Sequence, residues 1–136
     1  MSILSPNPTR VLILTASMGE GHNTAAKNIR NAIVAQVGSN AEVMVVDPYT
    51  RTNPVVNSLM QQGYSLAINH YPRVWKIVFE ILSKPGMIEG MGPLLTQLIN
   101  AVHGLVKEFR PHVIASTYPV FGYILAKVKK LDPAVD

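Results

Sequence analysis

The residue of this sequence best placed to do chemistry is His22. It follows an apolar run and lies in the segment Ser17-Met18-Gly19-Glu20-Gly21-His22-Asn23. An imidazole can accept a proton from a hydroxyl near pH 7, and the start of the helix expected from Asn23 onward disfavours its charged form. His22 is therefore a candidate general base. The competing interpretation is that it only caps or braces the turn.

Two glycines, Gly19 and Gly21, precede His22. They let the backbone approach a ligand closely, and the free N–H groups at the start of the next helix favour an anion. The competing interpretation is a tight turn without a ligand. The third glycine of a dinucleotide fingerprint is missing, and no Gly-Lys-Ser/Thr follows, so neither an NAD nor an ATP motif is present. Glu20 could orient the imidazole or serve solubility alone.

The other histidines and the cysteine content predict no further reactive centre. His70, His103 and His112 are dispersed and lack the spacing of metal ligands. Cysteine is absent, which excludes a thiolate nucleophile and a disulfide framework and suits a cytosolic protein. We therefore expect no metal site.

The elements that must position His22 can be predicted from apolar patterns. Short apolar runs between turn-forming residues predict strands at 11–14, 42–47 and 112–116. Helical spacing predicts helices at 23–37, 54–70, 72–83, 93–109 and 120–131. Strands that alternate with helices predict an α/β fold, a Rossmann-like parallel sheet with flanking helices. Three strands make a small sheet, so we expect an incomplete one, with the first and third strands buried.

Ligands of such a sheet bind at the carboxyl ends of the strands, so three segments should converge there. They are the loop at 15–23, the corner Asp47-Pro48-Tyr49 and the segment 116–119. Asp47 ends the second strand, where a Rossmann protein holds a ribose hydroxyl. It could equally cap the turn at Pro48.

Length and charge restrict the remaining function classes. The 136 residues fit one domain, 1–136. The sequence has 12 Lys and Arg residues and 8 Asp and Glu residues, and the resulting net charge of +4 favours anionic partners. Nucleic acid is disfavoured because this charge is small and the aromatic residues do not line a basic strand face. Pro6 and Pro8 interrupt the amino terminus, and no apolar run reaches the ~20 residues of a membrane span, so we expect neither a signal peptide nor a spanning helix.

A second signal lies between residues 71 and 91, where aromatic and basic side chains alternate. The aromatic residues Tyr71, Trp75 and Phe79 recur every four positions. The cations Arg73, Lys76 and Lys84 lie between and after them. An apolar loop with Met87, Ile88 and Met91 follows. This pattern fits docking to an anionic membrane surface. The competing interpretation is the buried face of a core helix.

With these residues in place, the chain resembles the amino-terminal half of the monogalactosyldiacylglycerol synthase and processive diacylglycerol glucosyltransferase family. The resemblance spans nearly the whole chain. It lies in Val11-Leu12-Ile13-Leu14, the segment from Ser17 to Ala26, Val45-Val46-Asp47, Tyr71-Pro72 with Trp75-Lys76, and the segment from Arg110 to Pro119. It implies a GT-B glycosyltransferase with two Rossmann-like halves, of which the amino-terminal one faces the membrane and takes the lipid acceptor.

The family's Gly-x-Gly-His motif maps onto this chain at His22, which the resemblance implies is the general base on the diacylglycerol hydroxyl. The implied acceptor-binding residues are Gly19, Glu20, Gly21, Asn23, Thr24, Thr117, Tyr118 and Pro119. Tyr118 stands where we expect His before Pro in the family. No cofactor is expected on this chain; the nucleotide-sugar co-substrate is expected on a donor-binding half that this truncated chain lacks or that a separate subunit supplies.

The expected function is therefore the acceptor side of an enzyme that moves a hexose from a nucleotide sugar to diacylglycerol. The expected location is cytoplasmic, peripheral at the inner membrane face, and negligible transfer is expected from the chain alone. The alternatives are a non-catalytic lipid- or partner-binding module and part of a murein-type lipid-linked glycosyltransferase.

Overall fold

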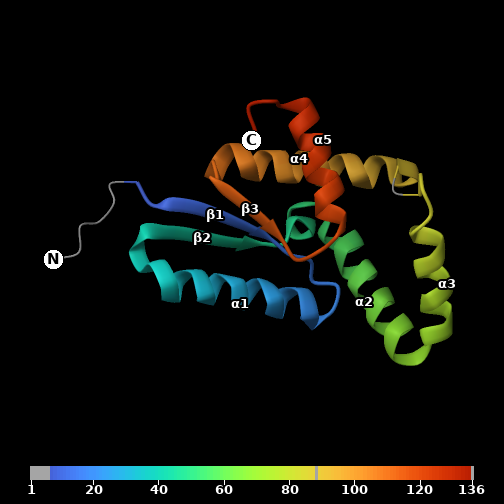
Figure 1. Ribbon diagram of the computed structural model, residues 1–136. Coiled ribbons are helices and arrows are strands. Elements are labelled where there is room, and N and C mark those ends of the chain that lie inside the picture. Colours follow the sequence, from blue (N-terminus) through green and yellow to red (C-terminus); the bar gives the residue numbers. More distant parts are fainter. Residues whose placement is uncertain (1–6, 88, 136) are drawn as a thin grey trace.

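The computed structural model describes residues 7–87 and 89–135. At its centre lies a sheet of three parallel strands in the order β2-β1-β3: β1 (Thr9–Leu14), β2 (Ala41–Val46) and β3 (Val113–Ser116) (Figure 1). In the register, Val11 lies opposite Val43 on one side and Val113 on the other. The predicted Rossmann-like α/β fold is confirmed.

Helices cover both faces of this sheet. One face carries α1 (Glu20–Val37), and the other carries α4 (Gly92–Phe109) and α5 (Val120–Leu131) (Figure 1). The central strand β1 therefore has a layer on each side, which explains why its apolar run is buried as predicted.

The core divides according to the alternation of side chains along β1. Leu12 and Leu14 pack among the buried residues of α4 and α5, whereas Val11 and Ile13 pack on the α1 side. The larger cluster, on the α4 and α5 side, also contains Phe121, which is completely buried. This cluster anchors the carboxyl ends of the strands.

The third strand differs from the expectation that it would be buried. Val113 is 51% exposed and Ser116 is also exposed. The reason is its place at the edge of the sheet: β3 pairs with β1 on one side, and no described residue pairs with its other side.

The first helix begins three residues earlier than the sequence predicts. Gly19 is its N-cap, with a φ of 83° that an L side chain rarely adopts, so Glu20 and Gly21 already belong to the first turn. His22 therefore lies on the helix and not before it. At the other end Gly38, with a φ of 54°, stops α1 as predicted.

Two further helices, α2 (Pro54–His70) and α3 (Pro72–Leu82), form a hairpin at one end of the molecule (Figure 1). Each begins with a proline in its first turn, where the missing N–H costs nothing. Asn53 caps α2 because its Oδ1 accepts hydrogen bonds from the backbone N–H of Val55 (3.0 Å) and Val56 (3.3 Å).

Short connections complete the chain. They are the 3₁₀ turns η1 (Gly38–Asn40), η2 (Pro48–Arg51) and η3 (Glu89–Met91). Among its described residues, the Gly- and Pro-rich segment before α4 contains turns and the short η3 but no α-helix or strand, as its composition predicts.

Candidate functional site

The site lies at the carboxyl ends of the three strands, where the predicted segments do converge. The N–H of Thr15 donates to the carbonyl oxygen of Val46 (3.0 Å), and the N–H of Thr117 donates to that of Leu14 (3.0 Å). These bonds extend the strand pairing by one residue beyond each strand end. The loop before α1 and the loop after β3 are thereby held against each other.

Asp47 caps the turn at Pro48, which is one of the two roles that the sequence allows for it. Its Oδ1 accepts from the backbone N–H of Tyr49 (2.9 Å), and its Oδ2 accepts from the backbone N–H of Ser17 (2.8 Å). Each carboxylate oxygen is therefore engaged within the protein. The side chain starts η2 and braces the loop that leads to His22.

The imidazole of His22 is oriented by one short contact. Its Nδ1 lies 2.6 Å from the backbone carbonyl oxygen of Thr117. Because a carbonyl oxygen can only accept, Nδ1 carries the hydrogen and donates it. The Nε2 of the neutral ring then keeps its lone pair, which is the form that a general base requires.

Hydroxyl groups around His22 hold the two loops together. Thr117 Oγ1 donates to the carbonyl oxygen of His22 (3.1 Å), and Thr15 Oγ1 donates to Oδ1 of Asn23 (3.0 Å). The amide of Asn23 in turn donates to Ser17 Oγ (3.3 Å). The structure thus gives the predicted acceptor-binding residues Asn23 and Thr117 bonds within the site, which position the loop.

Tyr118 packs directly on the candidate base. Its ring centroid is 5.0 Å from that of His22, with the two planes at 81°, and it also contacts Tyr49 and Phe121. Burial, with a smaller contribution from nearby Tyr64, raises the pKa of the Tyr118 hydroxyl above its ordinary value. A tyrosine phenol is already protonated at neutral pH, and this shift makes its ionisation still harder, so Tyr118 does not compete with His22 as a base.

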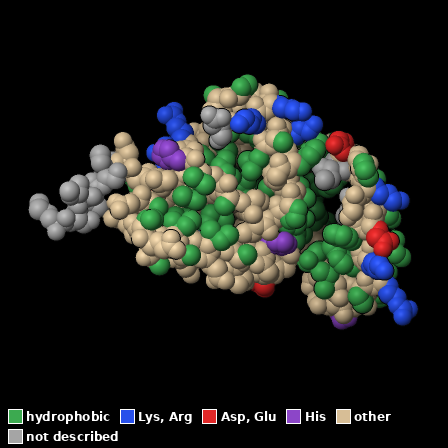
Figure 2. All heavy atoms as spheres, in the orientation of Figure 1, with side chains coloured by type: hydrophobic (Ala, Val, Ile, Leu, Met, Phe, Trp, Pro, Cys, Tyr) green, Lys and Arg blue, Asp and Glu red, His purple; other side chains and the backbone are tan. Residues whose placement is uncertain are grey.

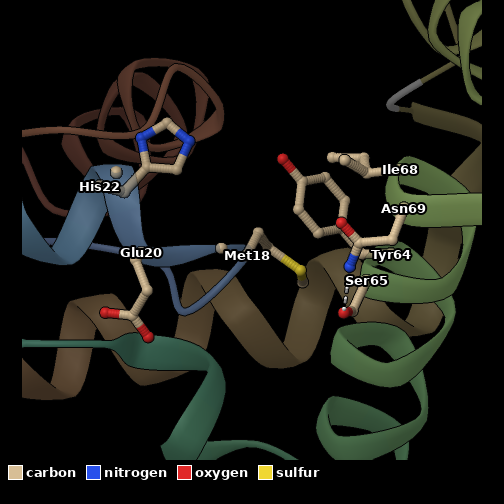
Figure 3. A pocket seen from close by; sticks show the side chains of 9 residues that line it. Met18, Glu20, His22, Tyr64, Ser65, Ile68 and Asn69 are labelled. Carbon is tan, nitrogen blue, oxygen red and sulfur yellow. Dashed lines mark hydrogen bonds between the residues drawn. The ribbon is translucent and has the colours of Figure 1, made fainter. Parts of the chain in front are cut away.

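A cavity of about 490 Å³ opens beside His22, between the loop before α1 and the helix α2 (Figure 3). Its lining residues are Met18, Gly19, Glu20, Gly21, His22, Tyr64, Ser65, Ile68 and Asn69. In Figure 3 the side chain of Glu20 points away from the His22 ring, so the Thr117 carbonyl, and not Glu20, orients the imidazole.

The structure therefore divides the predicted acceptor-binding residues. Gly19, Glu20 and Gly21 line the cavity with His22, whereas the exposed Thr24 and Pro119 are not among the lining residues. Sequence reasoning missed the whole α2 wall of the cavity. The available signal was the spacing by four of its lining residues, Tyr64 with Ile68 and Ser65 with Asn69, which places them along one side of a helix.

The predicted docking region is almost entirely exposed. Exposed side chains there are Tyr71, Arg73, Lys76, Phe79, Lys84, Met87 and Met91. Ile88 lies outside the described residues. No described residue of α3 is buried, so the competing interpretation of a buried core helix is wrong. Figure 2 shows apolar side chains over this hairpin with cations along its outer side.

Trp75 differs from the rest of the docking region because it is half-buried. Its ring lies against that of Tyr64, with centroids 4.8 Å apart and the planes at 87°. An edge-to-face pair of this kind contributes more stabilisation than the burial of its apolar area alone would give. The pair joins α3 to the α2 wall of the cavity.

Within the described residues, no helix combines the length and apolar character needed to cross a membrane. The same residues contain no group of three or more His, Cys, Asp or Glu side chains arranged to hold a metal ion.

A Rossmann-like sheet with an oriented imidazole and a cavity at its carboxyl edge is the arrangement in which α/β proteins hold their ligands. The chain belongs to the monogalactosyldiacylglycerol (MGDG) synthase family, whose family model matches residues 22–135. The family membership that the sequence motifs predicted is thus confirmed.

Three chloroplastic relatives illustrate this similarity. The chain is 27% identical to the monogalactosyldiacylglycerol synthase of Spinacia oleracea over 125 residues, which are 90% of this chain and 23% of that protein. It is 27% identical to monogalactosyldiacylglycerol synthase 1 of Arabidopsis thaliana over 89% of this chain and 23% of that protein. It is 23% identical to synthase 3 of the same plant over 88% of this chain and 26% of that protein. The chain therefore spans about a quarter of the length of these relatives. No solved structure gives a significant match.

Proposed function

We propose that this chain forms the acceptor side of a glycosyltransferase that moves a hexose from a nucleotide sugar to diacylglycerol. The observation that carries the proposal is the contact of His22 Nδ1 with the Thr117 carbonyl oxygen, which leaves Nε2 as a base beside the cavity. The names of the relatives, which are monogalactosyldiacylglycerol synthases, support diacylglycerol as the acceptor.

The size and lining of the cavity suit a lipid headgroup. Its volume, about 490 Å³, lies within the range of roughly 300–1,000 Å³ usual for small-molecule sites. Met18 and Ile68 offer apolar surface, while Tyr64 and His22 offer polar groups. A glycerol backbone with one free hydroxyl has the same mixed character.

The chemical step follows from the orientation of His22. Nε2 takes the proton of the acceptor hydroxyl while that oxygen attacks the anomeric carbon of the sugar. The bond from the anomeric carbon to the phosphate oxygen breaks, and the nucleoside diphosphate leaves with the electron pair. The imidazolium that forms is stabilised because its Nδ1–H already donates to the Thr117 carbonyl oxygen.

The nucleotide sugar is assigned to residues outside this chain. The relatives are about four times as long as the matched segment, which leaves room in them for a second, donor-binding half of the GT-B type. The donor half would come either from the same longer protein or from a separate subunit.

Membrane docking is assigned to α3 and the segment that follows it. Its apolar side chains Val74, Ile77, Phe79 and Ile81 are exposed, although such groups are normally covered. Arg73, Lys76 and Lys84 outnumber Glu80 and Glu89 in the same region, which favours an anionic lipid surface. We assign the protein to the cytoplasmic face of the inner membrane as a peripheral protein, with its cavity supplied from the lipid layer.

The test is the His22→Ala substitution in an active protein that contains this chain and a donor-binding domain. We expect turnover to fall by about 10²–10⁴, the usual contribution of a general base, with the donor Kd unchanged. His70→Ala, an exposed histidine at the end of α2, is the matched control and should keep wild-type turnover.

Wild-type turnover in His22→Ala would exclude His22 as the base. If the protein with its wild-type sequence bound vesicles but showed no transfer, a non-catalytic lipid-binding module would replace the proposed function. Transfer by the 136-residue chain alone, with UDP-glucose and diacylglycerol vesicles, would contradict the assignment of the donor site to other residues.

A further inference from the structure

We propose that Tyr64 selects the acceptor: across the cavity from His22, its hydroxyl donates a hydrogen bond to an ester carbonyl oxygen of the diacylglycerol. This assignment rests on the proposed function, because it names the part of the same acceptor that the α2 wall recognises. It adds a specificity-determining residue that the glycine-loop motif does not contain.

The position of Tyr64 is the first observation. It lies on α2 and lines the same cavity as His22. In Figure 3 its hydroxyl points toward the side of the cavity on which His22 lies. The phenol is also close enough to Tyr118, which packs on His22, to contribute to the raised pKa of the Tyr118 hydroxyl.

The second observation is that the Tyr64 ring is held in place on two sides. A Cβ on Gly19 would lie only 3.3 Å from Cε1 of Tyr64, so the ring packs closely against the backbone of the glycine loop. The ring also makes the edge-to-face contact with Trp75. A side chain held by two partners presents its hydroxyl in one direction at little entropic cost on binding.

The third observation concerns the hydrogen bonds of the α2 wall. The amide of Asn69 donates to Ser65 Oγ (3.2 Å), so these two polar side chains already bond to each other. For the Tyr64 hydroxyl, by contrast, no hydrogen-bond partner is found within residues 7–87 and 89–135. A phenol in this position is available as a donor to a ligand.

These groups match the polar atoms of diacylglycerol. His22 Nε2 is an acceptor that suits the free hydroxyl, and the Tyr64 hydroxyl is a donor that suits an ester carbonyl oxygen close to it in the same molecule. A dialkylglycerol keeps the hydroxyl but replaces both ester groups by ethers, which have no carbonyl oxygen. Tyr64 should therefore favour the ester-linked lipid.

The experiment measures sugar transfer by the active protein to 1,2-diacylglycerol and to 1,2-di-O-alkylglycerol of equal chain length in the same vesicles. Tyr64→Phe keeps the ring and its contacts but removes the hydroxyl. We expect it to lower kcat/KM for diacylglycerol about three- to tenfold, mainly through KM, and to leave the value for the dialkyl lipid unchanged. Tyr123→Phe on α5, which removes a hydroxyl from a residue that does not line the cavity and keeps the ring beside Lys127, should change neither value.

Each other outcome overturns the inference. An equal loss on both lipids would show that Tyr64 only supports the structure, and no loss on either would show that its hydroxyl contacts no acceptor group. In both cases the wild-type protein would still transfer sugar to diacylglycerol, and the proposed function would stand. A wild-type protein that transfers sugar to neither lipid would refute the proposed function and this inference together.

Discussion

The helices α3 and α4 are both amphipathic, yet they have opposite surroundings. α4 lies on the sheet and buries five apolar side chains: Leu98, Val102, Leu105, Val106 and Phe109. α3 packs beside α2, and none of its described residues is buried. The comparison teaches that helical periodicity identifies an apolar side, whereas the neighbouring elements decide whether that side is covered by protein.

The same contrast separates the two walls of the candidate site. The wall that carries His22 is tied to the sheet through Thr117, Thr15 and Asp47. The wall that carries Tyr64 belongs to the hairpin, whose apolar surface is exposed. We interpret the first wall as the rigid chemical part and the second as the part that meets the lipid.

The largest expected difference between the two regions concerns stability. Phe121→Ala removes a fully buried ring beside the sheet and should lower the free energy of unfolding by about 3–5 kcal/mol. Phe79→Ala removes a ring of α3 that is 60% exposed and should change it by less than about 0.5 kcal/mol. Urea unfolding followed by circular dichroism measures both. Equal losses would mean that α3 has a covered apolar side after all.

A second contrast concerns membrane binding, for which a substitution in α3 should have the larger effect and a substitution near the sheet the smaller one. Phe79→Ala should weaken binding of the chain to vesicles that contain phosphatidylglycerol by about 30-fold, which corresponds to about 2 kcal/mol for one aromatic ring. Leu131→Ala, a matched control that removes an apolar side chain 65% exposed on α5, should leave binding unchanged. Trp75 is the single tryptophan, so its fluorescence reports the titration. The same loss in both variants would show that binding does not depend on the hairpin.

A third difference lies where the two regions meet, at the two glycines before His22. Gly19→Ala should lower the free energy of unfolding by about 1–3 kcal/mol, because its φ of 83° strains an L residue and Tyr64 lies in the way of a Cβ. Gly21→Ala should raise it by about 0.5 kcal/mol, since nothing lies within 4 Å of its Cβ position and alanine favours the helix. Thermal unfolding of both variants tests this difference. A stable Gly19→Ala protein would mean that the loop and Tyr64 are not closely packed.

Much of the fold could be predicted from local patterns. The bounds of α2, from Pro54 to His70, and of α5, from Val120 to Leu131, match the predicted ranges. Proline at a helix start and glycine after a helix end act within a few residues, so a sequence shows them directly. The start of α1 was placed too late because the left-handed conformation of Gly19, and not the first apolar residue, begins the helix.

The candidate site was predictable in one half only. His22 could be singled out because it follows a glycine loop between a strand and a helix, which is a local arrangement. Tyr64 could not, because nothing in the periodicity of α2 says which side faces the glycine loop. The half-burial of Trp75 was missed for the same reason, since its partner lies on another helix.

The order of the elements, most of their boundaries and the choice of His22 as the candidate base follow from the order of residues along the chain, because they depend on contacts within one or two turns. The contact that orients His22 joins residues 95 positions apart, and the cavity needs a helix that begins more than thirty residues later. These features, together with the exposure of α3 and of the edge strand β3, depend on which surfaces pack against each other. Long-range packing is set by the competition of all apolar surfaces for the same sheet, and local sequence patterns carry no record of its outcome.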